Sequence, residues 1–72
     1  GRAIDISGFD LDGGLRINVK DHWKGRDARA QFLREVARNA CQLFNVVLTP
    51  DSNADHYDHI HLDIGPERYC DR

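Results

Sequence analysis

Alternation of apolar and polar residues along positions 59–64 constrains the fold of this 72-residue chain more than any other feature. One side of an extended segment there would carry His59, His61 and Asp63, and the other Ile60, Leu62 and Ile64. This period predicts a strand with one face in a core and the other presenting imidazoles and a carboxylate. Because such groups are ligands of divalent transition metals, the outer face is the first candidate for a functional site.

A second strand with a carboxylate on its outer face is predicted near the start of the chain, over residues 2–9. Its isoleucines point to one side and Asp5 to the other. Asp is disfavoured within strands, so Asp5 is either part of a solvated face or a ligand. Turn residues 10–14 and a further alternating run over 15–19 complete a predicted hairpin.

One helix is predicted over residues 28–44, with Asp27 as its N-cap. Its apolar stripe consists of Phe32, Leu33, Val36, Ala37, Ala40, Leu43 and Phe44. Its arginines fall outside that stripe, where a solvated face is the expected role. The preceding segment, 20–26, is predicted to be a loop, in which Trp23 covers one edge of the core rather than binding a ligand, and His22 is a surface histidine apart from the site.

A short strand at Val46–Leu48, a polar loop over 51–58, the histidine strand and a tail over 67–72 follow the helix. The order predicts an α+β domain in which a small, mostly antiparallel sheet packs against one main helix. All 72 residues form one unit that buries only about 60% of its unfolded surface. Because the chain begins with Gly rather than Met, we expect it to be a piece of a longer domain.

Composition excludes some classes of function. The formal net charge of −2 gives no basic excess for a nucleic-acid partner, and no apolar run reaches the length of a membrane span. There are two cysteines, Cys41 and Cys70, and no C-x-x-C motif. An even count favours one disulfide if the compartment is oxidising, with two free buried thiols as the alternative. The bridge would close a loop of about 30 residues and contribute about 3–4 kcal/mol.

A metal site becomes plausible if the first strand lies beside the last. Asp5 and His61 would then share the outer face, where directly opposed Cβ atoms are about 5 Å apart. Such a pair suits two ligands of one zinc ion, and a catalytic zinc commonly has three protein ligands and an open position. His59 shares the face of His61, and His56 precedes it on the loop, so either could move protons beside the metal.

Two patterns at opposite ends of the chain resemble those of a known family. Residues 1–5 read G-R-A-I-D, and residues 56–63 read H-Y-D-H-I-H-L-D. With the 32–44 helix and the closing Arg68-Tyr69-Cys70, they resemble the C-terminal domain of bacterial extensin-like proteins. That domain is grouped with D-alanyl-D-alanine carboxypeptidases and murein endopeptidases of the Hedgehog/DD-peptidase fold, whose members carry H-x-x-G-x-A-x-D and a later H-x-H.

The resemblance implies that Asp5 and His61 are zinc ligands. The first zinc-binding histidine of the family pattern would lie three residues before Gly1, so we expect these 72 residues to bind zinc weakly or not at all. The resemblance also implies that His59 is the adjacent catalytic or second-sphere histidine and His56 a further active-site histidine. Where the peptidases have a glutamate, this chain has Asp58, which leaves the general base open among His56, Asp58 and His59.

The function implied is that of a zinc-dependent metallopeptidase acting on peptidoglycan peptides in the periplasm or outside the cell. The main alternative is a non-catalytic cell-wall or peptide-binding module on the same fold. A ββα-metal nuclease is a weaker alternative, because Asp58-His59-Ile60 resembles its D-H-I but neither a following helix nor a basic surface is evident. A disulfide-stabilised interaction domain is the last alternative.

Overall fold

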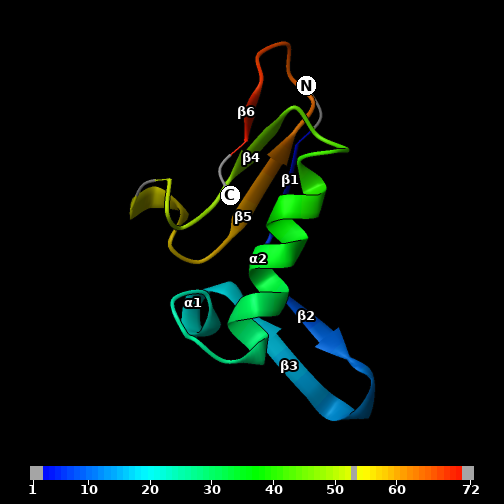
Figure 1. Ribbon diagram of the computed structural model, residues 1–72, viewed down its shortest axis with the longest axis vertical. Helices are drawn as coiled ribbons and strands as arrows, with labels where there is room; N and C mark the ends of the chain where they lie inside the picture. Colours follow the sequence, from blue (N-terminus) through cyan, green and yellow to red (C-terminus); the bar gives the residue numbers. More distant parts are fainter. Residues whose placement is uncertain (1–2, 53, 71–72) are drawn as a thin grey trace.

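A computed structural model describes residues 3–52 and 54–70 of the chain (Figure 1). Its elements are β1 (Ala3–Ile6), β2 (Gly8–Leu11), β3 (Leu15–Asn18), α1 (Val19–His22), α2 (Ala28–Ala40), β4 (Val46–Leu48), β5 (Ile60–Asp63) and β6 (Tyr69–Cys70). Two short 3₁₀ turns lie at η1 (Asp12–Gly14) and η2 (Ala54–His56). The predicted α+β class, with a sheet and one main helix, is confirmed.

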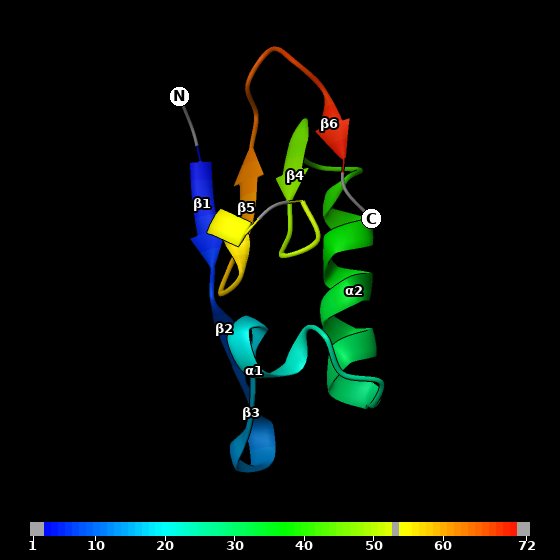
Figure 2. The same ribbon diagram turned by 90° about the vertical axis from the view of Figure 1, so that its left-hand side faces the viewer.

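The main sheet has the strand order β1-β5-β4-β6, and β2 pairs separately with β3. β5 is antiparallel to both of its neighbours, whereas β6 runs parallel to β4. Figure 2 shows α2 at the β6 side of the sheet and η2 on the opposite side, in front of β1 and β5. The face of the sheet turned away from α2 is therefore the one that η2 borders.

The core lies between α2 and the facing side of the sheet. Leu33, Val47 and Ile60 are fully buried in it, and Ala37 and Leu62 are nearly so. On β5, burial alternates along the strand, which confirms the predicted period. The same alternation turns His61 and Asp63 toward the face opposite α2.

The predicted first strand is two strands rather than one. The chain breaks at Ser7, so that β1 joins the main sheet and β2 forms the hairpin with β3. The turn between β2 and β3 covers residues 12–14 rather than the predicted 10–14. Gly13 and Gly14 adopt φ of 86° and 81° there, which glycine allows without a steric cost. Gly8 allows the hairpin strands to meet, since an added Cβ would lie 2.7 Å from the carbonyl oxygen of Ile17.

The segment predicted to be a loop over 20–26 begins as helix α1. Asn18 caps this helix by accepting a hydrogen bond from the Asp21 amide at 2.7 Å. Trp23 directly after it is 3% exposed and belongs to the core, in agreement with a packing role. Arg34 of α2 is not purely solvated, because it donates to the Trp23 carbonyl at 3.1 Å.

The end of the main helix was predicted too late. Asp27 caps its start as expected, accepting from the Ala30 amide at 3.2 Å, but α2 ends at Ala40 rather than at residue 44. The chain turns there, and Phe44 donates its amide to the carbonyl of Ala40 at 2.8 Å. Leu43, predicted in the buried stripe, is 79% exposed as a result.

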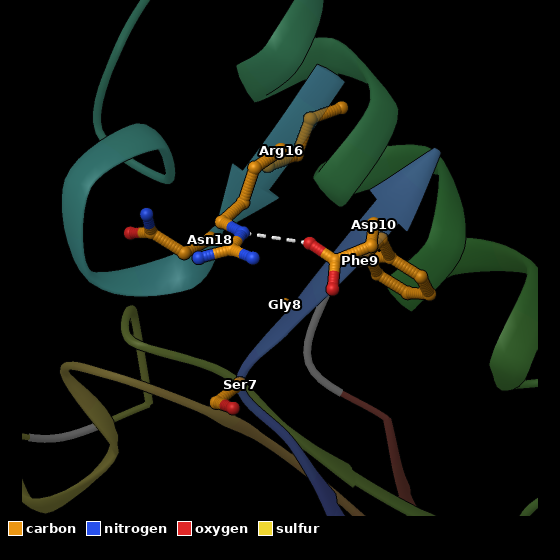
Figure 3. Close-up of a pocket in the computed structure, with 7 residues that line it drawn as sticks. Ser7, Gly8, Phe9, Asp10, Arg16 and Asn18 are labelled. Atoms are coloured by element: carbon orange, nitrogen blue, oxygen red, sulfur yellow. Dashed lines mark hydrogen bonds and ion pairs between the residues drawn. The ribbon is translucent and has the colours of Figure 1, made fainter. Parts of the chain in front are cut away.

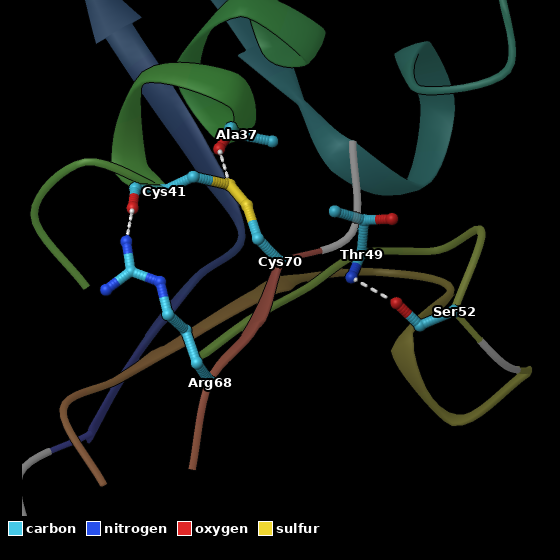
Figure 4. Close-up of a disulfide and its surroundings, with 6 residues drawn as sticks. All are labelled: Ala37, Cys41, Thr49, Ser52, Arg68 and Cys70. Atoms are coloured by element: carbon cyan, nitrogen blue, oxygen red, sulfur yellow. Dashed lines mark hydrogen bonds between the residues drawn. A yellow bond between two sulfur atoms is a disulfide. The ribbon is translucent and has the colours of Figure 1, made fainter. Parts of the chain in front are cut away.

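The disulfide between Cys41 and Cys70 is confirmed (Figure 4). The two Cα atoms lie 5.7 Å apart, within the range of native bridges. Arg68 extends over the same region and donates to the Cys41 carbonyl at 3.5 Å. The bridge therefore joins the end of α2 to β6, a strand that was predicted only as part of a tail.

Two isoleucines predicted in the core are half exposed, Ile4 at 52% and Ile64 at 48%. Ile4 lies on β1, the outer strand of the sheet, and Ile64 follows the end of β5, so α2 covers neither. Arg2, the first residue of the predicted strand, lies outside the described residues, and so do residues 71–72 of the predicted tail. No helix within 3–52 and 54–70 is long and apolar enough to cross a bilayer.

Candidate functional site

The first and last strands of the predicted site lie side by side. β1 and β5 are antiparallel neighbours, and their register places Asp5 opposite His61. The Nδ1 atom of His61 lies 2.8 Å from Oδ1 of Asp5, a hydrogen bond across the sheet between residues 56 positions apart. The expectation that these two side chains share the outer face is confirmed.

His59 lies on the same face, directly before β5, and is held by its neighbour in the sequence. Its Nδ1 atom is 2.9 Å from Oδ1 of Asp58. An ionised carboxylate only accepts hydrogen bonds, so Nδ1 carries the proton and donates. In the neutral ring, Nε2 is then unprotonated, and it lies 4.0 Å from Oδ1 of Asp5. Asp58 therefore orients His59 with its basic nitrogen toward the Asp5–His61 pair.

The electrostatics of Asp58 follow from this contact. The hydrogen bond from His59 lowers the pKa of the Asp58 carboxyl group below its usual range, and the positive charge of Lys20 on α1 contributes in the same direction. Desolvation of the group opposes this shift without cancelling it. Asp58 consequently stays ionised at neutral pH and able to accept the proton of Nδ1.

His56 completes the group from η2. Its ring centroid is 5.0 Å from that of His59 and 6.3 Å from that of His61. The predicted site residues Asp5, His56, Asp58, His59 and His61 are thus brought into one cluster on the face opposite α2. We call these five residues the histidine cluster.

Asp63 is a neighbour of the cluster that the sequence analysis did not assign to the site. Its Oδ2 atom is 3.4 Å from Nε2 of His61, and its Oδ1 atom accepts the Gly65 amide at 2.6 Å. His61 is therefore flanked by carboxylates on both ring nitrogens. The signal was present in the sequence, because Asp63 lies two positions after His61 on the same strand face.

His22 lies apart from the cluster, as predicted, although it is half-buried rather than superficial. Its Nδ1 atom accepts the Asn18 amide at 2.9 Å, and Nε2 is 3.1 Å from Nη1 of Arg29. These contacts link α1 to α2. A structural role accounts for this histidine.

The cluster matches zinc in donor type but not in number of converging ligands. Asp5 Oδ1 and His61 Nδ1 are the oxygen and nitrogen donors that zinc accepts. Their 2.8 Å separation is close to the roughly 3.3 Å that tetrahedral bonds of about 2 Å require. Within the described part of the chain, however, no three His, Cys, Asp or Glu side chains form a group able to hold a metal ion.

Comparison with known proteins assigns the chain to a family. No curated protein and no solved structure matches it significantly. The model of one family, described as extensin-like protein C-terminus, matches residues 1–71, which is nearly the whole sequence. The family resemblance noted in the sequence is thereby confirmed for its extensin-like part, and the chain belongs to the extensin-like protein C-terminus family.

Proposed function

We propose that the chain is the zinc-dependent peptidase domain of an extensin-like protein and that it hydrolyses amide bonds in cell-wall peptides. The observation that carries this proposal is the meeting of Asp5 and His61 across β1 and β5, with two further histidines beside them. We also propose that the chain is related to D-alanyl-D-alanine carboxypeptidases and murein endopeptidases and shares their Hedgehog/DD-peptidase fold. Peptidoglycan peptides are the proposed substrates.

Asp5 and His61 would hold the zinc ion, because their donor atoms are adjacent and of the right type. A third ligand is proposed to lie three residues before Gly1, as in the pattern of the peptidases. When bound, zinc supplies a Lewis acid that polarises an amide carbonyl and makes a water molecule more acidic. Residues 1–72 alone, with two of the three ligands, should bind the ion weakly.

His59 is the group best placed to move the proton. Asp58 fixes its ring by accepting from Nδ1, which leaves Nε2 directed toward Asp5 as the proton acceptor. Asp58 acts through His59 as a positioning residue, since its carboxylate is engaged by that ring. His56 lies at 5.0 Å from the same ring, where it can bind the substrate carbonyl or the departing amine. Of the three candidates for the general base, the geometry favours His59.

A periplasmic or secreted location is part of the proposal. Disulfides persist in oxidising compartments and are rare in the cytosol, and this small domain contains one. The murein layer is accessible from that side of the membrane. Location and substrate are therefore mutually consistent.

Metal binding and hydrolysis are tested separately. Calorimetric titration of the 72-residue chain with zinc should give weak binding that is reduced further in Asp5→Asn and unchanged in Asp12→Asn, an exposed aspartate of η1. Tight one-to-one binding would show that no upstream ligand is needed. The protein with the preceding residues, saturated with zinc, should release peptide from purified murein, as measured by mass spectrometry, and its Asp5→Asn variant should not.

A peptide-binding module without turnover is the second candidate. The observation in its favour is that the described residues do not bring three metal ligands together. Sedimentation with purified murein distinguishes the two functions. Retention on murein without release of peptide, by a protein whose zinc site is filled, would support the binding module and contradict the peptidase.

A further inference from the structure

A hollow of about 240 Å³ lies at the β2–β3 hairpin (Figure 3). Residues of both strands and of the preceding Ser7 line it: Ser7, Gly8, Phe9, Asp10, Arg16, Ile17 and Asn18. None of these residues was assigned to the predicted site. We call this feature the hairpin hollow.

The polar side chains of the hairpin point away from α2. The inner face of the hairpin packs against α2, because Phe9 contacts Phe32 edge-to-face at 5.2 Å and Ile17 is 3% exposed. Residues that alternate with Phe9 and Ile17 along the two strands therefore point away from α2. Ser7, which also lines the hollow, lies two positions after Asp5 in the sequence.

Gly8 allows β2 and β3 to approach each other closely beside the hollow. An added Cβ would lie 2.7 Å from the Ile17 carbonyl oxygen and 3.2 Å from the side chain of Asn18, so no side chain fits there. The volume is below the 300–1,000 Å³ typical of pockets for drug-sized ligands. The hollow therefore suits a single small head group rather than an extended ligand.

Charge indicates which head group fits. Arg16 and Asp10 form an ion pair across the rim, with Nε 2.7 Å from Oδ1, and both side chains are about three-quarters exposed at 75% and 74%. An exposed pair of this kind contributes little to stability, so its partners can exchange for others at little cost. A ligand with one charge would leave one partner unmatched. A ligand with adjacent positive and negative groups satisfies both and keeps the local charge unchanged.

We propose that the hairpin hollow is a binding subsite for a zwitterionic α-amino-acid head group, whose carboxylate pairs with Arg16 and whose ammonium pairs with Asp10. The planar guanidinium of Arg16 can bind the carboxylate through two parallel hydrogen bonds. The further step, that this subsite serves the substrate of the histidine cluster, rests on the proposed function. Binding of the head group itself requires neither zinc nor hydrolysis.

The test is an NMR titration of the ¹⁵N-labelled 72-residue chain with free alanine, N-acetylalanine and alaninamide. Alanine should shift the amides of residues 8, 10 and 16 in a saturable manner. The two single-charge analogues should bind about tenfold more weakly, since each lacks one charged hydrogen-bonding partner. A tripeptide with a central 2,6-diaminopimelate carries the same head group at the end of its side chain. Tighter binding of this tripeptide than of alanine would indicate a head group carried by a peptide, and tighter binding of alanine would indicate a free amino acid.

Variants provide the matched control. Arg16→Gln and Asp10→Asn should each weaken alanine binding about tenfold, whereas Arg26→Gln, at an exposed arginine outside the hollow, should not. Equal affinity for alanine, N-acetylalanine and alaninamide would overturn the subsite. Unchanged alanine binding by both Arg16→Gln and Asp10→Asn would do the same. Alanine binding at the hollow, together with no release of peptide from murein by the longer protein saturated with zinc, would contradict the peptidase and leave the subsite standing.

Discussion

His61 is the residue on which the candidate site depends most. It is held between Asp5 at 2.8 Å and Asp63 at 3.4 Å, so its ring cannot turn without losing a carboxylate. His59 is held in a similar way by Asp58. Both imidazoles therefore have fixed orientations, which the proposed proton transfer requires.

The Asp58–His59 contact should make stability depend on pH in a defined direction. Because the folded-state pKa of Asp58 is lowered, the contact stabilises the fold above the ordinary aspartate pKa of about 4 and loses its effect as the pH falls through the lowered value. Urea unfolding of wild type and Asp58→Asn between pH 2 and 7 measures this. The two curves should differ near neutrality and converge in acid.

A constant difference between the two proteins down to pH 2 would contradict this assignment. His59→Asn serves as the partner control, because removing the donor should abolish most of the pH dependence that Asp58 contributes. Asp12→Asn, in the exposed η1 turn, should follow wild type throughout.

At the scale of elements, the caps determine where the helices begin. Asp27 accepts the Ala30 amide at 3.2 Å, and Asn18 accepts the Asp21 amide at 2.7 Å. The first cap was identified in the sequence because an apolar period of helical type follows it. The second was missed because α1 has only four residues, too few for a period to be visible.

Removing the cap of α2 should be measurable. Asp27→Ala should lower the free energy of unfolding by about 1 kcal/mol, whereas Asp27→Asn, which keeps an accepting oxygen, should be close to wild type. Chemical denaturation followed by circular dichroism gives both values. An Asp27→Ala variant as stable as wild type would show that packing of α2 alone fixes its start.

Sequence patterns predicted β4, β5 and the start of α2 well, because local periods and a cap determine those elements. They did not predict β6 or the break at Ser7. The two residues of β6 pair parallel to β4 and are tied to α2 through a distant cysteine, so no local period marks them. Ser7 separates two sheets that together cover one helix, an arrangement set by packing rather than by neighbours in the sequence.

For the whole molecule, the disulfide is the main constraint on the C-terminal segment. β6 contributes only Tyr69 and Cys70 to the sheet, and its other links to the fold include Arg68 on the Cys41 carbonyl and the Tyr69 amide on the Asn45 carbonyl. A core of this size leaves little reserve of stability. The bridge, at a sequence separation of 29, supplies much of what the core cannot.

Removing the bridge should destabilise the whole domain. A double Cys41→Ala/Cys70→Ala variant, or reduction with dithiothreitol, should lower the free energy of unfolding by about 3–4 kcal/mol. Urea denaturation with and without reductant measures the change. The double variant should no longer respond to reductant, and an unchanged midpoint in reduced wild type would contradict the prediction.

The site could be anticipated from the sequence to the extent that strand periods fix which face a side chain occupies. Asp5 and His61 were placed on one face on that basis, their strands were supposed to be neighbours, and the register confirms that the two residues are opposed. The hairpin hollow could not be anticipated, because it depends on how β2 and β3 approach each other at Gly8. Such close approaches are tertiary properties that no local pattern records.

The 56-residue separation between Asp5 and His61 has a practical consequence. Neither half of the chain holds the pair, and a cut at exposed Leu43 would leave the halves joined through the Cys41–Cys70 bridge, so that they separate only once the bridge is reduced. Reassembly of the two fragments would restore the pair only when β1 docks beside β5. The domain thus lends itself to a split reporter, in which recovery of the cross-strand contact signals that two fused proteins have come together.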